Sequence, residues 1–257
     1  MDKENYNLLC DDLYLDMYVN TELELPSQRD TILTFFERIS KQYPSMSNFY
    51  RRDPNYYLEE ESPPQAEQYR WVALETSRIG SGIVNPERFE EAYTQGKFVL
   101  ELIPFMLGVN FLDINSLDAT IGMDFDYWGN HDELIAEALL GSGSLNCLLD
   151  LPSSRVIDCS PSIVVALSED NKTQARISIE SKTTIFDPRQ KESAAGGPDK
   201  SISLLFTVRQ YPQAGEKFDA IKSFEKQCRL AEELLAEKIL PNIIQPLVNK
   251  IAQKRFI

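Results

Sequence analysis

The stretch DLYLDMYVN, residues 12–20, alternates apolar and polar side chains along its whole length. A period of two is typical of a strand that buries one face. LPSQRDTILTFFERISKQYP follows at 25–44, and its apolar residues recur at helical spacing until Pro44 stops the pattern. The chain therefore opens with a strand and then a helix.

The rest of the first half predicts a pair of strands and a second helix. NFYRRDPNYYLEEES (48–62) and QYRWVALETSRIGSGIV (68–84) each favour one extended strand, with the break between them at SPPQ. Asn85-Pro86-Glu87 predicts a helix start with Asn85 as the capping residue and proline in the first turn. We expect this helix to run to about Leu107.

The second half repeats the order. FLDINSLDATIGMDFDYWGN (111–130) is extended, and HDELIAEALLG is a short helix that Asn130 caps and Gly141 ends. Strands are expected at about 155–168, 173–186 and 201–211, with SEDNKTQ as a hairpin turn and RQKESAAGGPDK (189–200) as a flexible loop. A long amphipathic helix closes the chain, and Pro241 and Pro246 should kink or divide it.

This order predicts an α+β fold with antiparallel sheets, helices on one face and a long C-terminal helix. It consists of two similar strand–helix–strands–helix modules, residues 1–108 and 109–257, associated tightly enough to count as a single domain. The order resembles the fold of the TATA-binding protein and of helix-grip ligand carriers, which concerns topology and carries no function.

Composition narrows the classes of function. The 257 residues carry a net charge of −14, which repels nucleic-acid phosphates and anionic lipid surfaces. No apolar run approaches the roughly 20 residues of a membrane helix, and the acidic start MDKENYNLLCDDLY lacks the pattern of a signal peptide. We therefore expect a cytoplasmic protein that binds neither nucleic acid nor membrane. The four cysteines are scattered without a close CxxC spacing, so we expect most of them to be small buried or half-buried side chains instead of a zinc or redox site.

MDFDYWGNHDE, residues 123–133, contains the only histidine. On a strand, Asp124 and Asp126 share one face, and His131 follows after a turn. Carboxylates and imidazole are ligands that a divalent metal prefers, so these three residues are a candidate metal site. The alternative is structural, because carboxylates on a solvent face and at a helix start are common. We predict no required cofactor, with a divalent metal as the alternative.

Aromatic and arginine side chains supply candidate ligand-binding residues. Rings interleaved with arginine can stack bases, but Glu59, Glu60 and Glu61 follow the arginines and would repel a phosphate backbone. A strand whose rings contact the core, and whose charges pair with Arg70 and Arg78, is the favoured interpretation. The candidates are Tyr50, Arg52, Tyr56, Arg70, Trp71 and Trp128.

A family resemblance covers nearly the whole chain. NFYRRDPNYYLEEES, YRWVALETSRIGSGIVNPE, VLELIPFMLGV, MDFDYWGNHDELIAEAL and RISIESKT resemble a conserved bacterial family of similar length found in planctomycetes. More remotely, the layout is similar to another sporadically distributed bacterial family. Neither family has an assigned function, so the resemblance implies a bacterial cytoplasmic protein and supplies no catalytic residues.

The function expected from these observations is that of a non-catalytic, acidic protein-binding or adaptor protein, with a protein partner or a second copy of itself. The reasons are the lack of a strong catalytic motif, the acidic body and the aromatic side chains. The alternative is a metal-assisted hydrolase or small-ligand carrier, with a pocket between a sheet and the long helix. The apolar C-terminal helix fits either an internal core helix or a subunit interface.

Overall fold

A computed structural model describes residues 6–61, 68–110, 112–181, 201–213 and 217–255. Within them, nine strands form one antiparallel sheet in the order β2-β3-β4-β5-β1-β6-β9-β8-β7. The strands are β1 (Asp12–Thr21), β2 (Met46–Arg52), β3 (Asn55–Glu60), β4 (Tyr69–Leu74), β5 (Arg78–Val84), β6 (Ile114–Asp126), β7 (Ser162–Ala166), β8 (Thr173–Ser181) and β9 (Ser201–Gln210). The predicted α+β class with antiparallel strands is confirmed.

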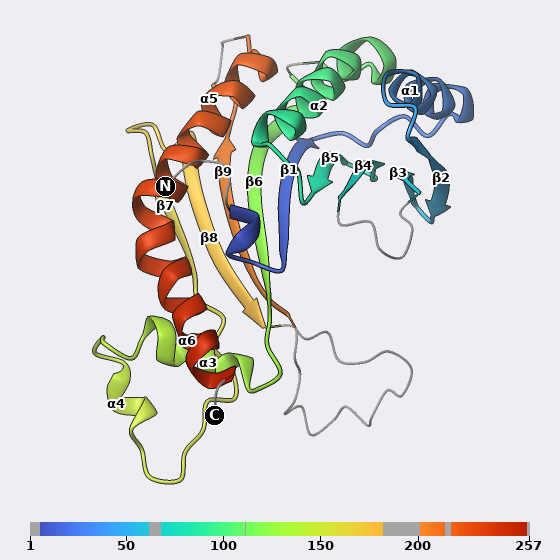
Figure 1. Cartoon of the computed structure of the whole chain (residues 1–257). Coiled ribbons are helices and arrows are strands. Elements are labelled where there is room, and N and C mark those ends of the chain that lie inside the picture. Colours follow the sequence, from blue (N-terminus) through green and yellow to red (C-terminus); the bar gives the residue numbers. More distant parts are fainter. Residues whose placement is uncertain (1–5, 62–67, 111, 182–200, 214–216, 256–257) are drawn as a thin grey trace.

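The main helices gather on one side of this sheet (Figure 1). They are α1 (Arg29–Gln42), α2 (Phe89–Leu102), α3 (His131–Leu139) and the C-terminal series of α5 (Ala220–Leu234), η3 (Leu235–Ile244) and α6 (Gln245–Arg255). Short elements complete the described chain: η1 (Tyr6–Leu8), η2 (Ile103–Leu107) and α4 (Asn146–Leu149). No helix in the described part of the chain is both long enough and apolar enough to cross a membrane.

The two halves of the chain meet at the centre of the sheet, where β1 pairs antiparallel with β6. The first half then continues outward through β5, β4, β3 and β2, and the second through β9, β8 and β7. Each half begins with a central strand followed by a helix, and ends with a helix that crosses its own strands. The halves therefore share one topology within one sheet, and the second half has one strand fewer among the described residues.

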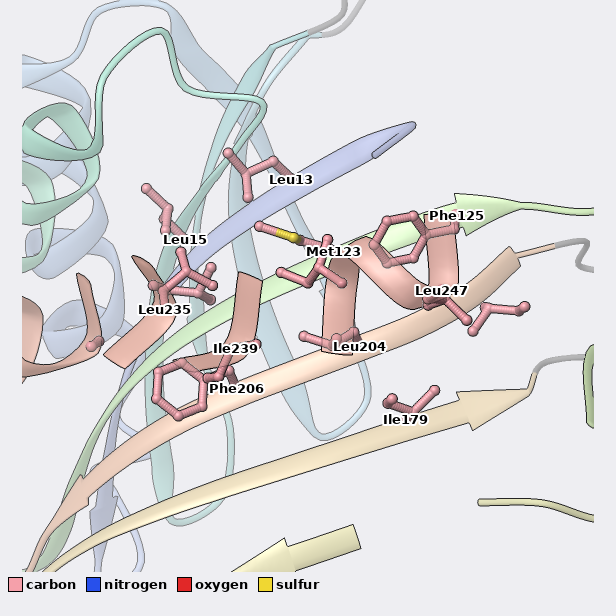
Figure 2. Close-up of a cluster of buried hydrophobic side chains, with 14 of the residues drawn as sticks. Leu13, Leu15, Met123, Phe125, Ile179, Leu204, Phe206, Leu235, Ile239 and Leu247 are labelled. Atoms are coloured by element: carbon pink, nitrogen blue, oxygen red, sulfur yellow. The ribbon is translucent and has the colours of Figure 1, made fainter. Parts of the chain in front are cut away.

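Alternation along β1 explains why one face is covered. Leu13, Leu15, Met17 and Val19 are at most 2% exposed and point toward the helices, while the residues between them point the other way. The side chains under the long helix fill the space between it and the sheet (Figure 2). Leu235, Ile239 and Leu247 supply much of the helix side of this contact. The apolar stripe of the C-terminal helix therefore packs within the chain.

Two local predictions need correction. Residues 48–62 and 68–84 form four strands instead of two, because the chain reverses tightly at Asp53-Pro54 and again between β4 and β5. A proline turn explains the first reversal, although the alternating pattern continues through it. Asn85 does not cap α2. Its backbone φ is 48°, and its side chain holds β1 by accepting from the Leu13 N–H and donating to Asp12.

Other boundaries differ in smaller ways. β7 begins at Ser162 instead of about 155, and it pairs with β8 through the predicted hairpin turn. Residues 182–186 and the loop expected at 189–200 lie outside the described residues. Pro241 interrupts the α-helical pattern, and the helix accommodates it by widening into the π-helical η3 without stopping. Asn130 caps α3 as predicted, its side chain accepting from the Glu133 N–H at 3.1 Å.

Candidate functional site: the open face of the sheet

The face of the sheet opposite the helices is named here the open face. Successive residues of a strand point to opposite faces of the sheet, so the strand register shows which residues lie on the open face. In the first half this face carries six half-buried aromatic side chains: Tyr14, Tyr18, Tyr50, Tyr57, Tyr69 and Trp71. Aromatic side chains concentrated on an uncovered surface are typical of recognition sites.

Glycines in β5 allow these rings to lie flat on the backbone. A Cβ added at Gly80 would come within 2.8 Å of the Trp71 ring, and one at Gly82 would meet both Trp71 and the Asp16 carboxylate. The Trp71 ring therefore lies directly against the backbone of Gly80 and Gly82. The centroids of the Trp71 and Tyr18 rings are 5.9 Å apart. Any side chain at Gly82 would displace both neighbours, which explains glycine at this position.

Tyr50 and Tyr57 form a second aromatic layer toward the β2 edge. They are paired residues on β2 and β3, and their rings are stacked with centroids 5.2 Å apart. Arg52 covers the Tyr50 ring at 5.2 Å, a cation–π distance, and the Tyr50 hydroxyl donates to Glu59. Pairing within the layer fixes the rings before any partner arrives, which lowers the entropy lost on binding.

The part of the open face formed by β1–β5, which carries the six rings, is called the aromatic half. Asp16 lies on β1, at its boundary with the second half of the sheet. Its Oδ1 atom is buried and has no hydrogen-bond partner among the described residues, while Oδ2 accepts weakly from the Tyr18 hydroxyl at 3.4 Å. Burial raises the pKa of Asp16 to about 7, against the opposing effects of Tyr18 and the nearby Arg78 guanidinium. Arg78 itself lies 4.6 Å from the centre of the Tyr18 ring and is held by Glu75.

The second half of the open face is polar, and its groups pair with one another. Asp118 accepts two bonds from Arg209 at 2.7 and 2.6 Å, and the Thr120 and Thr207 hydroxyls lie 2.9 Å apart. Such a bidentate pair is a strong charge-assisted contact. A hollow of about 460 Å³ opens between these strands, and its lining includes Asp16, Arg78, Arg176 and Tyr211. The open face thus changes from aromatic to polar at β1 and β6.

The predicted ligand-binding residues divide between two faces. Tyr50, Arg52 and Trp71 lie on the open face, where sequence reasoning did not place them together. Tyr56 faces the helices and contacts the core. Trp128 is 77% exposed in the segment after β6.

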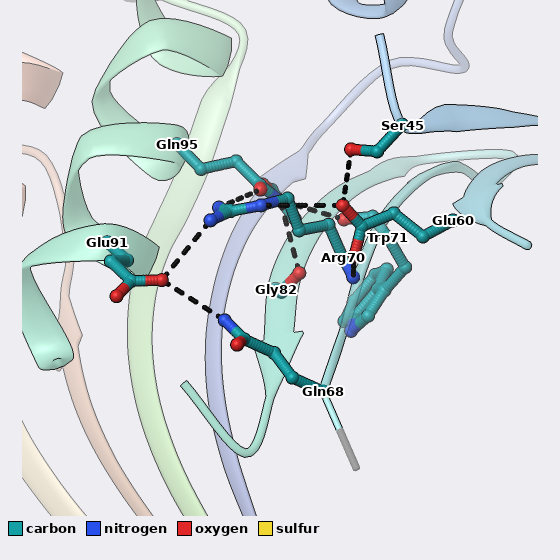
Figure 3. Close-up of polar contacts among 9 residues, drawn as sticks. Ser45, Glu60, Gln68, Arg70, Trp71, Gly82, Glu91 and Gln95 are labelled. Carbon is teal, nitrogen blue, oxygen red and sulfur yellow. Dashed lines mark hydrogen bonds and ion pairs between the residues drawn. The ribbon is translucent and has the colours of Figure 1, made fainter. Parts of the chain in front are cut away.

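Arg70 also faces the helices, where it has a structural role (Figure 3). It forms ion pairs with Glu60 and with Glu91 of α2, at 3.7 and 3.2 Å, and donates to Gln95 at 3.2 Å. Gln95 is fully buried and donates in turn to the Trp71 and Gly82 carbonyl oxygens. This network attaches α2 to β4 and β5, so Arg70 is not available on the open face.

The metal hypothesis finds no support in the geometry. Among the described residues, no three His, Cys, Asp or Glu side chains are grouped as a metal site requires. Asp124 accepts from the Tyr14 and Ser203 hydroxyls at 2.9 and 2.5 Å. His131 is 1% exposed on the helix side, with its Nε2 2.8 Å from the Tyr127 carbonyl oxygen. Burial raises the pKa of Asp126, with Asp11 adding to the effect. Asp124 and His131 thus have contacts within the chain, and the divalent-metal alternative stays a prediction.

Core side chains fill the space between the sheet and the middle of the long helix. An apolar hollow of about 740 Å³ lies at the amino end of that helix, between α5, η2 and the end of β1. Leu100, Pro104, Phe218 and Ile221 line it, together with Val19 from β1. The cysteines are free: Cys228 is buried, Cys10 and Cys159 are half-buried, and Cys147 is exposed.

Comparisons with known proteins add little to this description. No protein-family model and no curated protein matches the sequence. Among solved structures, a chain from a complex of A. aeolicus tRNASec with M. kandleri SerRS aligns at 10% identity with a TM-score of 0.21. The alignment covers 89% of this chain but only 32% of that one, and likeness at this level carries no argument about fold or function. The resemblance to a planctomycete family remains a prediction.

Proposed function

We propose that this protein is a non-catalytic protein-binding module that holds its partner on the aromatic half of the open face. The observation that supports this most directly is the set of six half-buried rings on the face of the sheet that no described helix covers. Tyrosine and tryptophan bury large areas at a low entropic cost, which is why they dominate binding energy at protein interfaces. A nine-stranded sheet also holds them more rigidly than a loop would.

Charge indicates what kind of partner this surface would take. The chain carries 40 acidic against 26 basic residues. Asp12, Asp16 and Glu59 lie among the rings on the open face, together with Arg52 and Arg78. A partner with a basic and apolar surface is complementary to this arrangement, and its association should weaken as salt increases. A cytoplasmic adaptor is the class of protein that these features fit best.

The test is affinity capture with matched variants of the full chain. A Tyr50→Ser, Tyr57→Ser double variant removes one aromatic layer from half-buried edge positions, and circular dichroism confirms that it folds. The control is Phe105→Ser, which removes a ring that is 89% exposed outside this face. We expect the wild type and the control to retain the same protein from an extract of the producing cells, and the double variant to lose it. Equal retention by all three would refute the proposal.

A small-ligand carrier is the second candidate, and the apolar hollow beside α5 supports it. Its volume of about 740 Å³ falls within the range of roughly 300 to 1,000 Å³ that small-molecule pockets occupy. Native mass spectrometry of the protein from its own host decides between the two. A retained small mass favours the carrier, whereas a retained protein that depends on Tyr50 and Tyr57 favours the binding module.

A further inference from the structure

Among the residues that the structure describes, β7 ends the sheet on the side opposite β2, and all five of its residues are exposed. Ile163, Val164 and Val165 are 61%, 57% and 44% exposed, so the strand shows apolar side chains on both of its faces. A free, apolar edge strand offers an unpaired row of backbone groups to any other strand. Natural proteins usually block such an edge with a charge, a proline or a bulge, and SIVVA contains neither charge nor proline.

The opposite edge shows the protection that β7 lacks. β2 carries Arg51 and Arg52 near its end, and its register with β3 shifts between Met46 and Asn48, as at a bulge. The two edges therefore differ in kind. In the first half the outermost strand is charged and irregular. Among the described residues, the second half of the sheet stops one strand earlier, at a neutral and regular strand.

The hydrogen-bond pattern shows which backbone groups of β7 point outward. The Leu167 N–H donates to the Thr173 carbonyl across the hairpin, and the Ile179 N–H donates to the Pro161 carbonyl. Odd-numbered residues therefore bond inward to β8, and the N–H and C=O groups of Ser162, Val164 and Ala166 point to the free edge. Only registers that engage these three residues can extend the sheet.

We propose that β7 pairs antiparallel with β7 of a second copy of this chain, about a twofold axis at Val164. In that register Val164 pairs with Val164 of the other copy, and Ser162 of each copy pairs with Ala166 of the other. All three outward-pointing residues therefore exchange backbone hydrogen bonds with the second copy. On the helix side, Ile163 of each copy meets Val165 of the other. The ladder contains no charge to oppose it, so the strand is complementary to itself, as a twofold interface requires.

The dimer extends both sheets into one and leaves both open faces on the same side. This follows because antiparallel neighbours in one sheet are related by an axis perpendicular to it. The pairing uses a surface separate from the aromatic half, so it does not depend on the proposed function. If both proposals hold, the dimer presents two aromatic surfaces together, and a bivalent partner would bind more tightly than to either alone.

Charge at the ends of β7 distinguishes a second copy from another partner. Each copy carries a net charge of −14, and Asp158, Glu169 and Asp170 flank the strand. Self-pairing brings the flanking carboxylates of the two copies toward each other, so screening by salt should strengthen the dimer. A different partner with basic ends would show the opposite salt dependence.

Sedimentation equilibrium of the full chain tests the pairing. We expect a species of twice 29.4 kDa whose dissociation constant falls at least threefold between 50 and 500 mM NaCl. Val164→Pro removes an outward N–H while leaving the inward bonds to β8, so it should abolish the dimer and keep the fold. Val164→Thr retains the N–H and a β-branched side chain, and should still form the dimer.

Two further variants test the pairing without a proline, in case Val164→Pro does not fold. Val164→Lys places like charges opposite each other at an exposed position and should weaken the dimer at least tenfold. Asn48→Lys makes the same change on the β2 edge and should leave the dimer unchanged. A monomer for the wild type at 100 µM in 500 mM NaCl overturns the proposal. So does a dimer that survives Val164→Pro, or one that strengthens as salt is removed.

Discussion

The two halves of the sheet share one topology and differ in what they expose. The first half presents aromatic rings on its open face and a charged, irregular edge at β2. The second half presents paired polar groups on that face and a neutral, apolar edge at β7. Because the covered face is apolar in both halves, packing determines the shared architecture. The surfaces that packing leaves free are the ones that differ, and our two proposals assign recognition to the first half and self-association to the second.

The largest expected effect comes from breaking the core of each half in turn. Phe35 lies in the cluster under α1 and Phe206 in the cluster under the long helix, and they are 0% and 2% exposed. Phe35→Ala and Phe206→Ala should each lower the free energy of unfolding by about 3–5 kcal/mol. Because β1 and β6 join the halves in one sheet, we expect both variants to shift a single urea transition.

Circular dichroism and the fluorescence of Trp71, in a Trp128→Phe background, measure that transition. Phe105→Ala serves as the control, since its ring is 89% exposed and its loss should change stability by less than about 0.5 kcal/mol. Two separate transitions, each shifted by only one of the core variants, would show that the halves unfold independently.

Much of this architecture could be predicted from the sequence, and the failures are informative. The period of two in DLYLDMYVN and the helical spacing in TILTFFERIS predict the correct elements, because burial imposes those periods. The turn at Asp53-Pro54 was missed because alternation continues across it and the turn residues do not interrupt the pattern. Strand order could not be deduced locally, so the grouping of Tyr14, Trp71 and Tyr57 on one face emerged only once the register was known.

The candidate site was predicted less well than the fold. Trp71, Tyr50 and Arg52 were proposed as binding residues for their chemistry, and they do lie on the open face. Arg70 is adjacent in sequence to Trp71, yet points to the opposite side, as alternation along a strand requires. The metal candidates were chosen for ligand chemistry alone. Their partners, such as Tyr14 and Ser203 for Asp124, come from distant strands, so no sequence spacing could have revealed them.

A smaller loss of stability is expected from replacing either of two glutamines that occupy matching positions in the two halves. Gln95 of α2 is fully buried and donates to the Trp71 and Gly82 carbonyls, and Gln227 of α5, 1% exposed, donates to the Leu117 and Val208 carbonyls. The Gln95 oxygen also accepts from Arg70, whereas the Gln227 oxygen has no partner among the described residues.

Gln95→Ala should therefore lower the free energy of unfolding by about 2–3 kcal/mol and Gln227→Ala by about 1–2 kcal/mol, because only the first also removes a hydrogen-bond acceptor from the half-buried Arg70. Urea denaturation measures both values. Gln245→Ala, at an exposed helical position, is the control and should be nearly neutral. An equal or reversed order would mean that the hydrogen bonds to the sheet matter more than the Arg70 network.

The smallest effect concerns Asp16, the carboxylate on the open face that burial leaves with an unpartnered oxygen. Because burial raises the pKa of Asp16 to about 7, the folded state binds more protons than the unfolded state between about pH 4 and pH 7. The contribution of Asp16 to stability is then most favourable below pH 4 and is lost as pH rises to 7. Asp16→Asn removes the charge, so it should stabilise the protein at pH 8 by about 1–2 kcal/mol and have little effect at pH 4.

Urea denaturation of wild type and variant at pH 4, 6 and 8 tests this, with Glu24→Gln as an exposed control whose effect should not vary in this way. The second half supplies the contrast, since its open-face carboxylate Asp118 is paired with Arg209 and Asp118→Asn should destabilise at pH 8. If Asp16→Asn also destabilises at pH 8, the charged form of Asp16 is stabilised by its neighbours and the aromatic half is as well paired as the polar one. If it stabilises, the first half keeps an uncompensated carboxylate beside its rings, and a cationic group on a partner is the complement that would stabilise it.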